Sequence, residues 1–423
     1  MRMYNLFPLL AGPVSQWDKH LARAADLGFN AVFINPVQKP GYSGSLYSVV
    51  DYQALNPLFI DAHAKASPEA QMRKVLTRAR EHHGLTPVVD LVINHCAFDS
   101  TLLKTNPEWF FWENGQVVHP SCDENGHRVV WEDLARFNHR PTQNAEGLHD
   151  LFYRAAKYLL DLGFTGFRCD AAYQVPRATW ERLFARLRRD HPEVRFMAET
   201  LGCTPDQTRE TAGAGFDYVF NSSKWWDFNG AWLMEQYDLI REAAPSISFP
   251  ESHDTPRLAA ETNGNVNALK QRYLFAALFS AGVLMPMGYE FGFRKPMHVV
   301  NSRPTDWEQN TGVDLSDFIR KVNQLKASHE VFQGDHPTAM LHTNNPKVLL
   351  MWKGSTKTRE EALVIINKDI WNWQHFETGS LRPLVQSGAP LECVSPANPM
   401  PFVAEPFVYE LQPGEAIVLT TKR

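Results

Sequence analysis

Short apolar runs alternate with amphipathic stretches along roughly the first 330 residues of the chain. Apolar runs of four to eight residues predict strands, and apolar residues spaced three and four apart predict helices. The predicted strands are residues 5–10, 29–35, 85–93, 166–169, 194–198, 217–220, 246–250 and 283–287. The predicted helices are residues 14–26, 68–82, 146–162, 180–190, 205–212, 230–243, 267–281 and 315–329.

This alternation of strand and helix indicates an α/β protein with a parallel sheet. Eight such units predict a closed (β/α)8 TIM barrel. An open doubly wound sheet is the alternative, but the first strand is not followed by a glycine-rich phosphate-binding sequence. We therefore expect the barrel.

Two segments depart from the alternation. Residues 96–142 show little periodicity and many aromatic, Asn and Pro residues, and an insertion of this length is usually functional. After residue 331 the chain has short strand-like runs separated by Pro and Gly, which predict an antiparallel β domain. We therefore expect a catalytic barrel at residues 1–95 and 143–330, an insertion at 96–142, and a C-terminal antiparallel β-sandwich domain at 331–423.

Composition narrows the function classes. Of 423 residues, 44% are hydrophobic and 21% are charged, which is ordinary for a soluble globular protein. A net charge of −5 gives no basic field for nucleic acid or an anionic membrane. The sequence has no apolar run of about 18 residues and no signal peptide pattern. Its five cysteines, which lack zinc-site spacing, suit a reducing compartment, so we expect a cytoplasmic protein and leave its oligomeric state open.

Acidic residues follow three of the predicted strands, where barrel enzymes display catalytic side chains. Asp170 ends the strand at 166–169, and Arg168 lies two residues earlier, on the same face of that strand. The guanidinium would keep the carboxylate ionised, as a nucleophile requires. A purely architectural Arg–Asp pair is the alternative for this stretch alone.

Glu199 follows the next predicted strand, 29 residues after Asp170, so the two carboxylates should come from adjacent strands. Glycoside hydrolysis usually requires at least such a pair of carboxyl groups. Glu199 lies in an apolar setting that would raise its pKa and suit a general acid. Asp254 follows the seventh predicted strand, and a chance gathering of three carboxylates is much less probable than one of two.

Four motifs together carry a resemblance to a known family: DLVINH at 90–95, GFRCDAA at 166–172, MAET at 197–200 and SHD at 252–254. In this order and spacing they resemble the α-amylase family, glycoside hydrolase family 13, of retaining glycosidases and transglycosylases. The stretch SLYSVVDY at 45–52 is similar to the family's segment after the second strand. The insertion would then be a short domain B, and the C-terminal β domain would be domain C.

The resemblance implies an enzyme that acts on α-glucans or maltooligosaccharides through a covalent β-glycosyl-enzyme intermediate. It implies Asp170 as nucleophile, Glu199 as acid/base, and Asp254 as the carboxylate that binds ring hydroxyls and stabilises the transition state. Asp90 would brace Arg168. The residues expected to bind substrate are Tyr47, Asp51, His95, Arg168, Tyr173, His253 and Arg257.

The sequence departs from the family at the acceptor side. Starch-active members often carry Lys-His three residues after the nucleophile, and this chain has Tyr173 and Gln174 there. The family's calcium site uses the residue equivalent to Asn94, but its partners are not identifiable in this sequence. We therefore expect no required cofactor and name no metal ligand, with calcium left as an open alternative.

Two other functions remain as alternatives. The stretches at 169–183 and 288–296 are similar to bacterial maltosyltransferases that extend α-glucans from maltose 1-phosphate, although those enzymes lack a histidine at the position of His253. A non-catalytic carbohydrate-binding or scaffold relative would be favoured by loss of a carboxylate, and all three are present. Trp225-Trp226 and the aromatic run at 109–112 are candidate sugar platforms, with core packing at least as probable for each.

Overall fold

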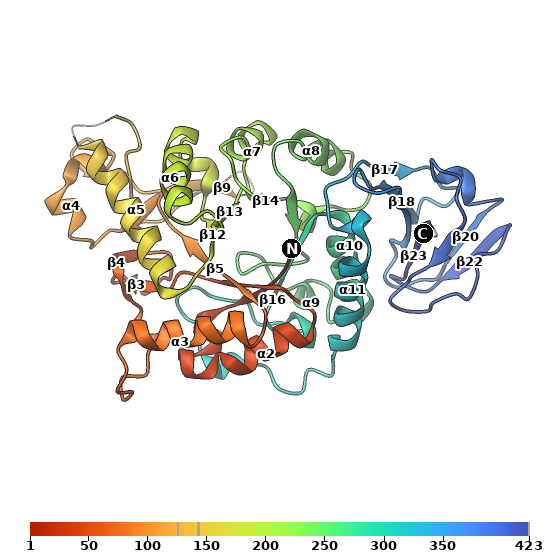
Figure 1. Ribbon diagram of the computed structural model, residues 1–423, viewed down its shortest axis with the longest axis horizontal. Helices are drawn as coiled ribbons and strands as arrows, with labels where there is room; N and C mark the ends of the chain where they lie inside the picture. Colours follow the sequence, from red (N-terminus) through yellow and green to blue (C-terminus); the bar gives the residue numbers. More distant parts are fainter. Residues whose placement is uncertain (125–126, 142–143, 422–423) are drawn as a thin grey trace.

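The computed structural model describes residues 1–124, 127–141 and 144–421. Its centre is a closed barrel of parallel strands in the order β1-β16-β15-β14-β13-β12-β5-β2 (Figure 1). The barrel strands are β1 (Arg2–Leu6), β2 (Ala31–Ile34), β5 (Thr86–Leu91), β12 (Gly166–Cys169), β13 (Arg195–Ala198), β14 (Tyr218–Phe220), β15 (Ser246–Ser248) and β16 (Gly282–Pro286). The predicted (β/α)8 TIM barrel is confirmed.

The first strand begins and ends earlier than predicted. It was expected at 5–10, but β1 ends at Leu6 and Pro8 opens the short helix α1 (Pro8–Ala11). Proline has no backbone N–H to donate to a sheet, whereas its fixed φ suits the first position of a helix.

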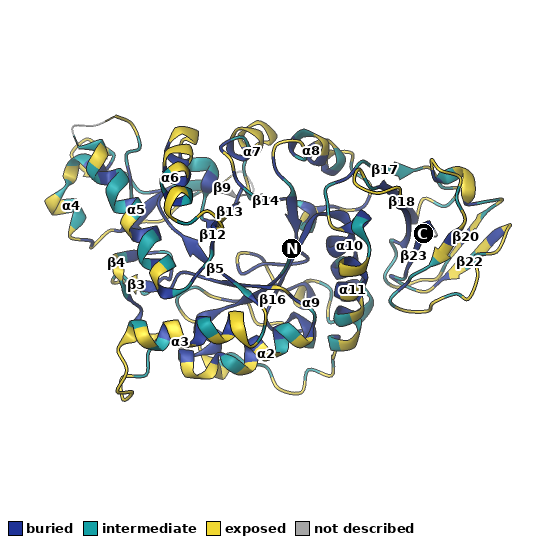
Figure 2. Cartoon of the chain, viewed as in Figure 1, coloured by how far each residue is buried: buried dark blue, intermediate teal, exposed yellow. Residues whose placement is uncertain are grey.

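The main helices surround the barrel (Figure 1). They are α2 (Asp18–Asp26), α3 (Pro68–Glu81), α5 (Ala145–Leu162), α6 (Arg177–Asp190), α7 (Pro205–Ala212), α8 (Trp232–Ile240), α10 (Val266–Phe279) and α11 (Ser316–Ser328). Local signals fix several ends: the Ser67 side chain accepts from the Ala70 N–H at 3.2 Å to start α3, and Gly163 ends α5 with a φ of +111°. Their outer faces are exposed and the barrel strands are buried (Figure 2).

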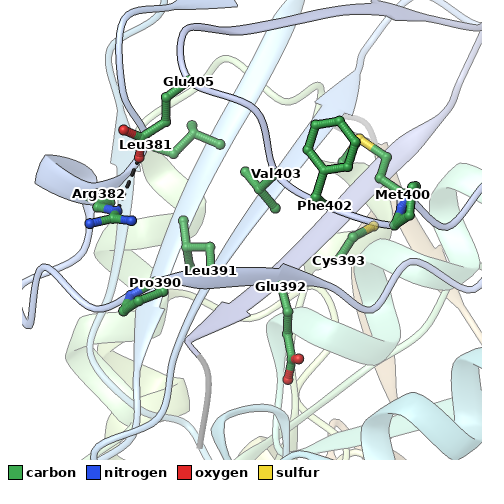
Figure 3. A pocket seen from close by; sticks show the side chains of 11 residues that line it. Leu381, Arg382, Pro390, Leu391, Glu392, Cys393, Met400, Phe402, Val403 and Glu405 are labelled. Carbon is green, nitrogen blue, oxygen red and sulfur yellow. Dashed lines mark ion pairs between the residues drawn. The ribbon is translucent and has the colours of Figure 1, made fainter.

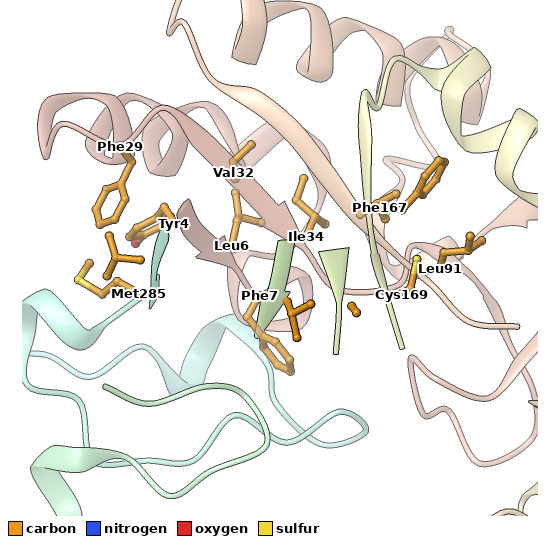
Figure 4. Packing of buried hydrophobic residues seen from close by; sticks show 14 of the residues in the cluster. Tyr4, Leu6, Phe7, Phe29, Val32, Ile34, Leu91, Phe167, Cys169 and Met285 are labelled. Atoms are coloured by element: carbon orange, nitrogen blue, oxygen red, sulfur yellow. The ribbon is translucent and has the colours of Figure 1, made fainter. Parts of the chain in front are cut away.

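Alternate residues of the barrel strands face two separate cores. Leu6, Val32 and Ile34 pack outward against the helices, together with other buried residues of that layer (Figure 4). Phe33, which lies between Val32 and Ile34, belongs to the cluster inside the barrel with Met197. This two-residue period is what a strand imposes, so both faces of the sheet must be apolar and the strands read as continuous apolar runs.

The segment after β5 contains more secondary structure than its sequence indicated. Its elements are β6 (His95–Ala97), α4 (Leu102–Thr105), β7 (Trp112–Glu113), β8 (Gln116–Val117), β9 (Ser121–Glu124), β10 (His127–Val130) and β11 (Leu134–Arg136). Strands β7 and β8 form one short antiparallel hairpin and β9 and β10 another, while β6 pairs antiparallel with the distant β11. Strands of two to four residues are too short to give a visible period. The predicted boundary at 142–143 lies outside the described residues.

A hairpin formed by β3 (Gln38–Pro40) and β4 (Val49–Leu55) lies between β2 and α3, where we expected a polar loop. None of the helices among the described residues is both long and apolar enough for a membrane crossing.

The C-terminal part is an antiparallel β domain, as predicted. A five-stranded sheet contains β17 (Thr338–Leu341), β18 (Val348–Gly354), β19 (Glu361–Asn367), β23 (Ala416–Thr421) and β21 (Leu391–Cys393), and β20 (Gln374–Thr378) pairs with β22 (Phe407–Leu411). Trp352, Phe376 and Phe407 belong to a separate apolar core in this domain.

The β domain has a hollow of about 320 Å³ on its surface (Figure 3). Leu391, Val403 and the exposed Phe402 line it, and the Arg382–Glu405 ion pair at 3.1 Å borders it. The three carboxylates expected to be catalytic line a different cavity, at the mouth of the barrel.

Candidate active site

A cavity of about 780 Å³ lies at the carboxyl ends of the barrel strands. Asp170 follows β12, Glu199 follows β13 and Asp254 lies beyond β15, and all three line this cavity. Parallel strands end at the same edge, so residues distant in sequence meet there. Of the predicted substrate-binding residues, the lining includes Tyr47, His95, Arg168 and Tyr173.

Arg168 links the carboxylates at the base of the cavity. Its Nη1 donates to Asp90 Oδ1 and to Asp170 Oδ1, both at 2.8 Å, and its Nη2 lies 3.5 Å from Asp254 Oδ2. Burial alone lowers the pKa of Arg168, but Asp90 and the other acidic groups raise it well above its usual value. A charged guanidinium therefore faces the Asp170 carboxyl group at 2.8 Å.

Glu199 is held differently. Its Oε2 accepts from the Ala171 N–H at 2.9 Å and its Oε1 accepts from the Leu201 N–H at 2.5 Å, and the residue is only 8% exposed. Burial raises the pKa of Glu199 to about 7, with Arg168 opposing the shift and Asp170 adding to it. A carboxyl group with this pKa can donate a proton near neutral pH.

Tyr47 is fixed by three polar contacts. Its hydroxyl donates to Asp90 Oδ2 at 2.7 Å, accepts from Asn35 Nδ2 at 3.0 Å and lies 2.6 Å from His253 Nε2. Because the single hydroxyl proton goes to Asp90, the contact with His253 requires a proton on Nε2. Burial lowers the pKa of His253, so we assign the neutral Nε2–H tautomer. That nitrogen also lies 3.1 Å from Asp254 Oδ2.

Polar side chains form a second chain of contacts on another wall. Asn94 Nδ2 donates to Gln174 Oε1 at 3.0 Å, and Gln174 Nε2 donates to Tyr173 OH at 3.2 Å. Tyr173 is partly buried and lines the cavity. Burial lowers the pKa of His95, and its buried Nε2 has no hydrogen-bond partner among the described residues. A neutral imidazole with an unused nitrogen can bind a sugar hydroxyl.

Two predicted substrate-binding residues lie elsewhere. Asp51 is exposed on β4 and, together with Tyr52, lines a separate cavity of about 520 Å³. Arg257 is 1% exposed and donates from Nη1 to Glu251 Oε1 at 2.7 Å and from Nη2 to the Met287 carbonyl at 3.0 Å. This buried pair supports the loop after β15.

The cavity also has lining residues that we did not predict. Trp131 and Asp133 come from the insertion, whose lack of periodicity hid their position, and Cys203 comes from the loop after β13. Of the tryptophan pair 225–226, Trp225 is exposed and lines the cavity, whereas Trp226 is buried. The composition of this stretch does not show which of the two tryptophans is exposed and which is buried.

Asn94, which the family's calcium site would use, offers one candidate donor for a calcium ion. Calcium needs six to eight oxygen ligands, usually including carboxylates. Asn94 Oδ1 is buried and has no hydrogen-bond partner within the described ranges, so it is a single free oxygen. No cluster of three or more His, Cys, Asp or Glu suited to a metal ion occurs in the part of the chain that the structure describes. We therefore assign no chemical step to a metal.

Comparison with known proteins gives consistent results. Residues 2–115 match the family model described as the glucanotransferase domain of glycogen debranching enzyme. The chain is 25% identical over 375 residues to an α-1,4-glucan:maltose-1-phosphate maltosyltransferase of Burkholderia pseudomallei, covering 85% of this chain and 32% of that protein. It is 22% identical to a maltogenic α-amylase of Bacillus acidopullulyticus, covering 83% of this chain and 61% of that protein.

The chain thus spans between a third and three fifths of the length of these relatives. Solved structures resemble it over its whole length. A noncanonic maltogenic α-amylase from Thermotoga neapolitana has a TM-score of 0.77 at 19% identity, covering 100% of this chain and 99% of that chain. An α-amylase from H. orenii has a TM-score of 0.79 at 16% identity, with coverage of 100% and 99%. At these identities the likeness shows the fold.

Proposed function

We propose that this chain, as an α-amylase-like protein of glycoside hydrolase family 13, is a retaining enzyme that acts on α-glucans or maltooligosaccharides. One observation carries the proposal. Glu199 is buried with a pKa raised to about 7, beside an Asp170 that Arg168 holds at 2.8 Å. Retaining glycosidases use two carboxyl groups in one cavity, a buried one that can donate a proton and a second one that attacks the sugar.

In the first step, Glu199 gives its proton to the glycosidic oxygen while Asp170 attacks the anomeric carbon. The bond to the leaving sugar breaks and a covalent β-glycosyl-enzyme forms. In the second step, Glu199 takes a proton from water or from a sugar hydroxyl, which attacks the same carbon and releases Asp170. Two inversions leave the product in the α configuration.

The surrounding groups hold the sugar at the point of cleavage. Asp254 is half-exposed in the cavity and accepts hydrogen bonds from ring hydroxyls, with Arg168 and His253 beside it. The ring of Tyr47, fixed through its hydroxyl, provides a face on which the sugar stacks. His95 donates or accepts at a hydroxyl through its unpartnered nitrogen.

Hydrolysis and transfer use the same residues and differ in what attacks the glycosyl-enzyme. A maltosyl phosphate donor is a second candidate, because several relatives are maltose-1-phosphate maltosyltransferases. A non-catalytic role is disfavoured, since a binding module needs neither the raised pKa of Glu199 nor three carboxylates around one cavity.

Product analysis tests the proposal. The protein is incubated with maltooligosaccharides of defined length, with and without inorganic phosphate, and products are separated by chromatography. Shortened products alone indicate a hydrolase, longer products indicate a transferase, and maltose 1-phosphate indicates the maltosyltransferase branch. Asp170→Asn is the control and should form none of them. An unchanged substrate mixture with the wild-type protein would reject an enzymatic role on these glucans.

The cytoplasmic location and the boundaries at residues 95, 142 and 330 also remain proposals. The location rests on the cysteine pattern and on the composition. Cell fractionation tests the location, and limited proteolysis around these three positions tests the boundaries.

A further inference from the structure

Two tryptophans are strongly exposed on the β domain. Trp371 is 65% exposed and Trp373 is 59% exposed, and both lie in the connection between β19 and β20. We call residues 368–373 the tryptophan turn. Large aromatic side chains normally bury most of their surface, so two exposed ones separated by a single residue need an explanation.

The tryptophan turn is held in one conformation. Asp369 Oδ1 accepts from the Trp371 N–H at 2.9 Å and from the Asn372 N–H at 3.1 Å. Asn367 Nδ2 donates to the Asn372 carbonyl at 2.8 Å, and the Gly414 N–H donates to the Asp369 carbonyl at 2.9 Å. The two indole rings are therefore carried on an ordered backbone, so that less conformational freedom is lost when a ligand binds.

Contacts with the barrel place the turn at the same end of the molecule as the catalytic cavity. Asn265 caps the start of α10 and its Nδ2 donates to the Ile370 carbonyl at 3.2 Å. A helix that follows a barrel strand starts at the carboxyl end of the strands, where the cavity lies. Lys368 Nζ donates to Asn229 Oδ1 at 2.6 Å, and Asn229 belongs to the loop that also carries Trp225 into the cavity.

Polar side chains on the strand that follows the turn, and on the strand paired with it, suit a neutral polyhydroxyl ligand. Trp373 and His375 are two residues apart along an extended segment, and His375 Nδ1 lies 2.6 Å from Glu410 Oε1. Imidazole and carboxylate groups can bind sugar hydroxyls, and indole rings stack on the apolar faces of sugars. Lys368 and Lys347 lie at the turn, but the acidic Asp369, Glu377 and Glu410 offset their charge. The region therefore lacks the excess of Lys and Arg that usually accompanies exposed tryptophans at an anionic membrane.

We propose that the tryptophan turn is a second carbohydrate site that binds an α-glucan chain outside the catalytic cavity. This inference rests on the proposed function for the choice of ligand. A chain held at both places is bound more tightly than one held at the cavity alone, because the second contact is intramolecular. Long or branched glucans should gain from the turn, and a disaccharide-sized substrate should not.

The test separates binding from catalysis. In an Asp170→Asn background, which leaves the polymer intact, retardation by glycogen is measured by affinity electrophoresis for the parent protein and for a Trp371→Ala/Trp373→Ala variant. Phe402→Ala is the matched control, an aromatic residue 73% exposed in the same domain but outside the turn. With Asp170 restored, turnover of α-maltosyl fluoride reports on the fold and on the cavity.

We expect the double variant to bind glycogen at least about tenfold more weakly, about 1.4 kcal/mol, with maltosyl fluoride turnover unchanged and Phe402→Ala like the parent. Equal retardation in the double variant and the parent, or an equal loss in Phe402→Ala, would overturn the proposal. So would a concentration-dependent dimer lost in the double variant, because the turn would then contact a second copy. If instead the catalytic proposal is wrong, the wild-type protein will not turn over maltosyl fluoride, whatever the result of the glycogen-binding experiment.

Discussion

The backbone N–H of Ala171 donates to Glu199 Oε2 at 2.9 Å, although the two residues follow different barrel strands. Ala171 directly follows Asp170, so a single peptide unit joins the proposed nucleophile to the proposed acid. Ala171 has a φ of +42°, a left-handed conformation that costs a non-glycine residue about 1–2 kcal/mol. The strain is consistent with a backbone shaped to hold both carboxyl groups in place.

The raised pKa of Glu199 predicts how activity depends on pH. Burial raises this pKa to about 7, and only the protonated form can donate to the leaving group. We expect kcat/KM on maltooligosaccharides to fall about tenfold per pH unit above the pKa of the free enzyme. Initial rates at low substrate concentration between pH 5 and 9 measure this limb. A flat profile through pH 8 would contradict the assignment.

The same group predicts how stability depends on pH. The pKa of Glu199 is about 7 in the folded state and 4.5 is its ordinary value, so between these values the folded state holds a proton that the unfolded chain has lost. The contribution to the free energy of unfolding is therefore complete below pH 4.5 and disappears as the pH rises through 7, a change of about 3 kcal/mol at most. The Glu199→Gln variant has no titrating group at this position and therefore lacks this pH-dependent contribution.

Urea unfolding of wild type and Glu199→Gln at pH 4.5 and 7.5 measures this difference. Wild type should lose stability relative to the variant as the pH rises. Glu113→Gln, on the exposed strand β7, is the matched control and should follow wild type. Parallel pH dependence of all three proteins would show that Glu199 is not the group responsible.

The sequence predicts most of the barrel because its strands are buried on both faces. The predicted strand at 166–169 has the same bounds as β12, a run of four buried residues that begins at Gly166 and ends just before Asp170. Asp170, Glu199 and Asp254 line one cavity because parallel strands bring their carboxyl ends together. Their chemical roles remain predictions.

Other features depend on contacts that a local pattern does not contain. Asp51 lies in a stretch that resembles the family, and Arg257 was expected to bind substrate. Asp51 is nevertheless exposed on β4, and a buried carboxylate holds Arg257. The insertion closes through β6 and β11, which are almost forty residues apart, so Trp131 could not be placed beforehand. The period of apolar residues indicates which positions of a local segment are buried, but it does not predict pairing between strands that are far apart in sequence.

A general acid is needed most when the leaving group is poor. Glu199→Gln should therefore lose glucan cleavage by about a hundredfold or more, but still form a glycosyl-enzyme from α-maltosyl fluoride, because fluoride leaves without a proton. Mass spectrometry of the intact protein detects the trapped adduct on Asp170. Equal loss on both substrates would indicate a structural role for Glu199.

Retention requires direct attack by Asp170. In a substrate complex, we expect its carboxyl group to lie about 5–5.5 Å from that of Glu199. The first product observed by NMR should carry the α anomer before mutarotation. A separation near 9 Å with room for water, together with a β product, would make the enzyme inverting and would remove Asp170 as nucleophile.

The last prediction concerns the acceptor side, where this chain departs from the pattern of the family that it resembles. Tyr173 lines the cavity and is tied through Gln174 to Asn94, so its ring is oriented by two hydrogen bonds. A tyrosine face can stack on an incoming sugar, whereas water gains nothing from it. We expect Tyr173→Ala to lower the ratio of transfer to hydrolysis several-fold at high oligosaccharide concentration, while the formation of the glycosyl-enzyme stays nearly unchanged.

Tyr173→Phe is the matched control, since it keeps the ring and loses only the hydroxyl that accepts from Gln174. If stacking decides the ratio, Tyr173→Phe should behave like wild type. If the hydrogen-bonded orientation decides it, both variants should fall together. The ratio is measured from longer and shorter products in one reaction, and the burst of fluoride from α-maltosyl fluoride reports on the first step. A ratio that stays constant in Tyr173→Ala would assign acceptor binding to other residues of the cavity, with Trp131 and Trp225 the next to test.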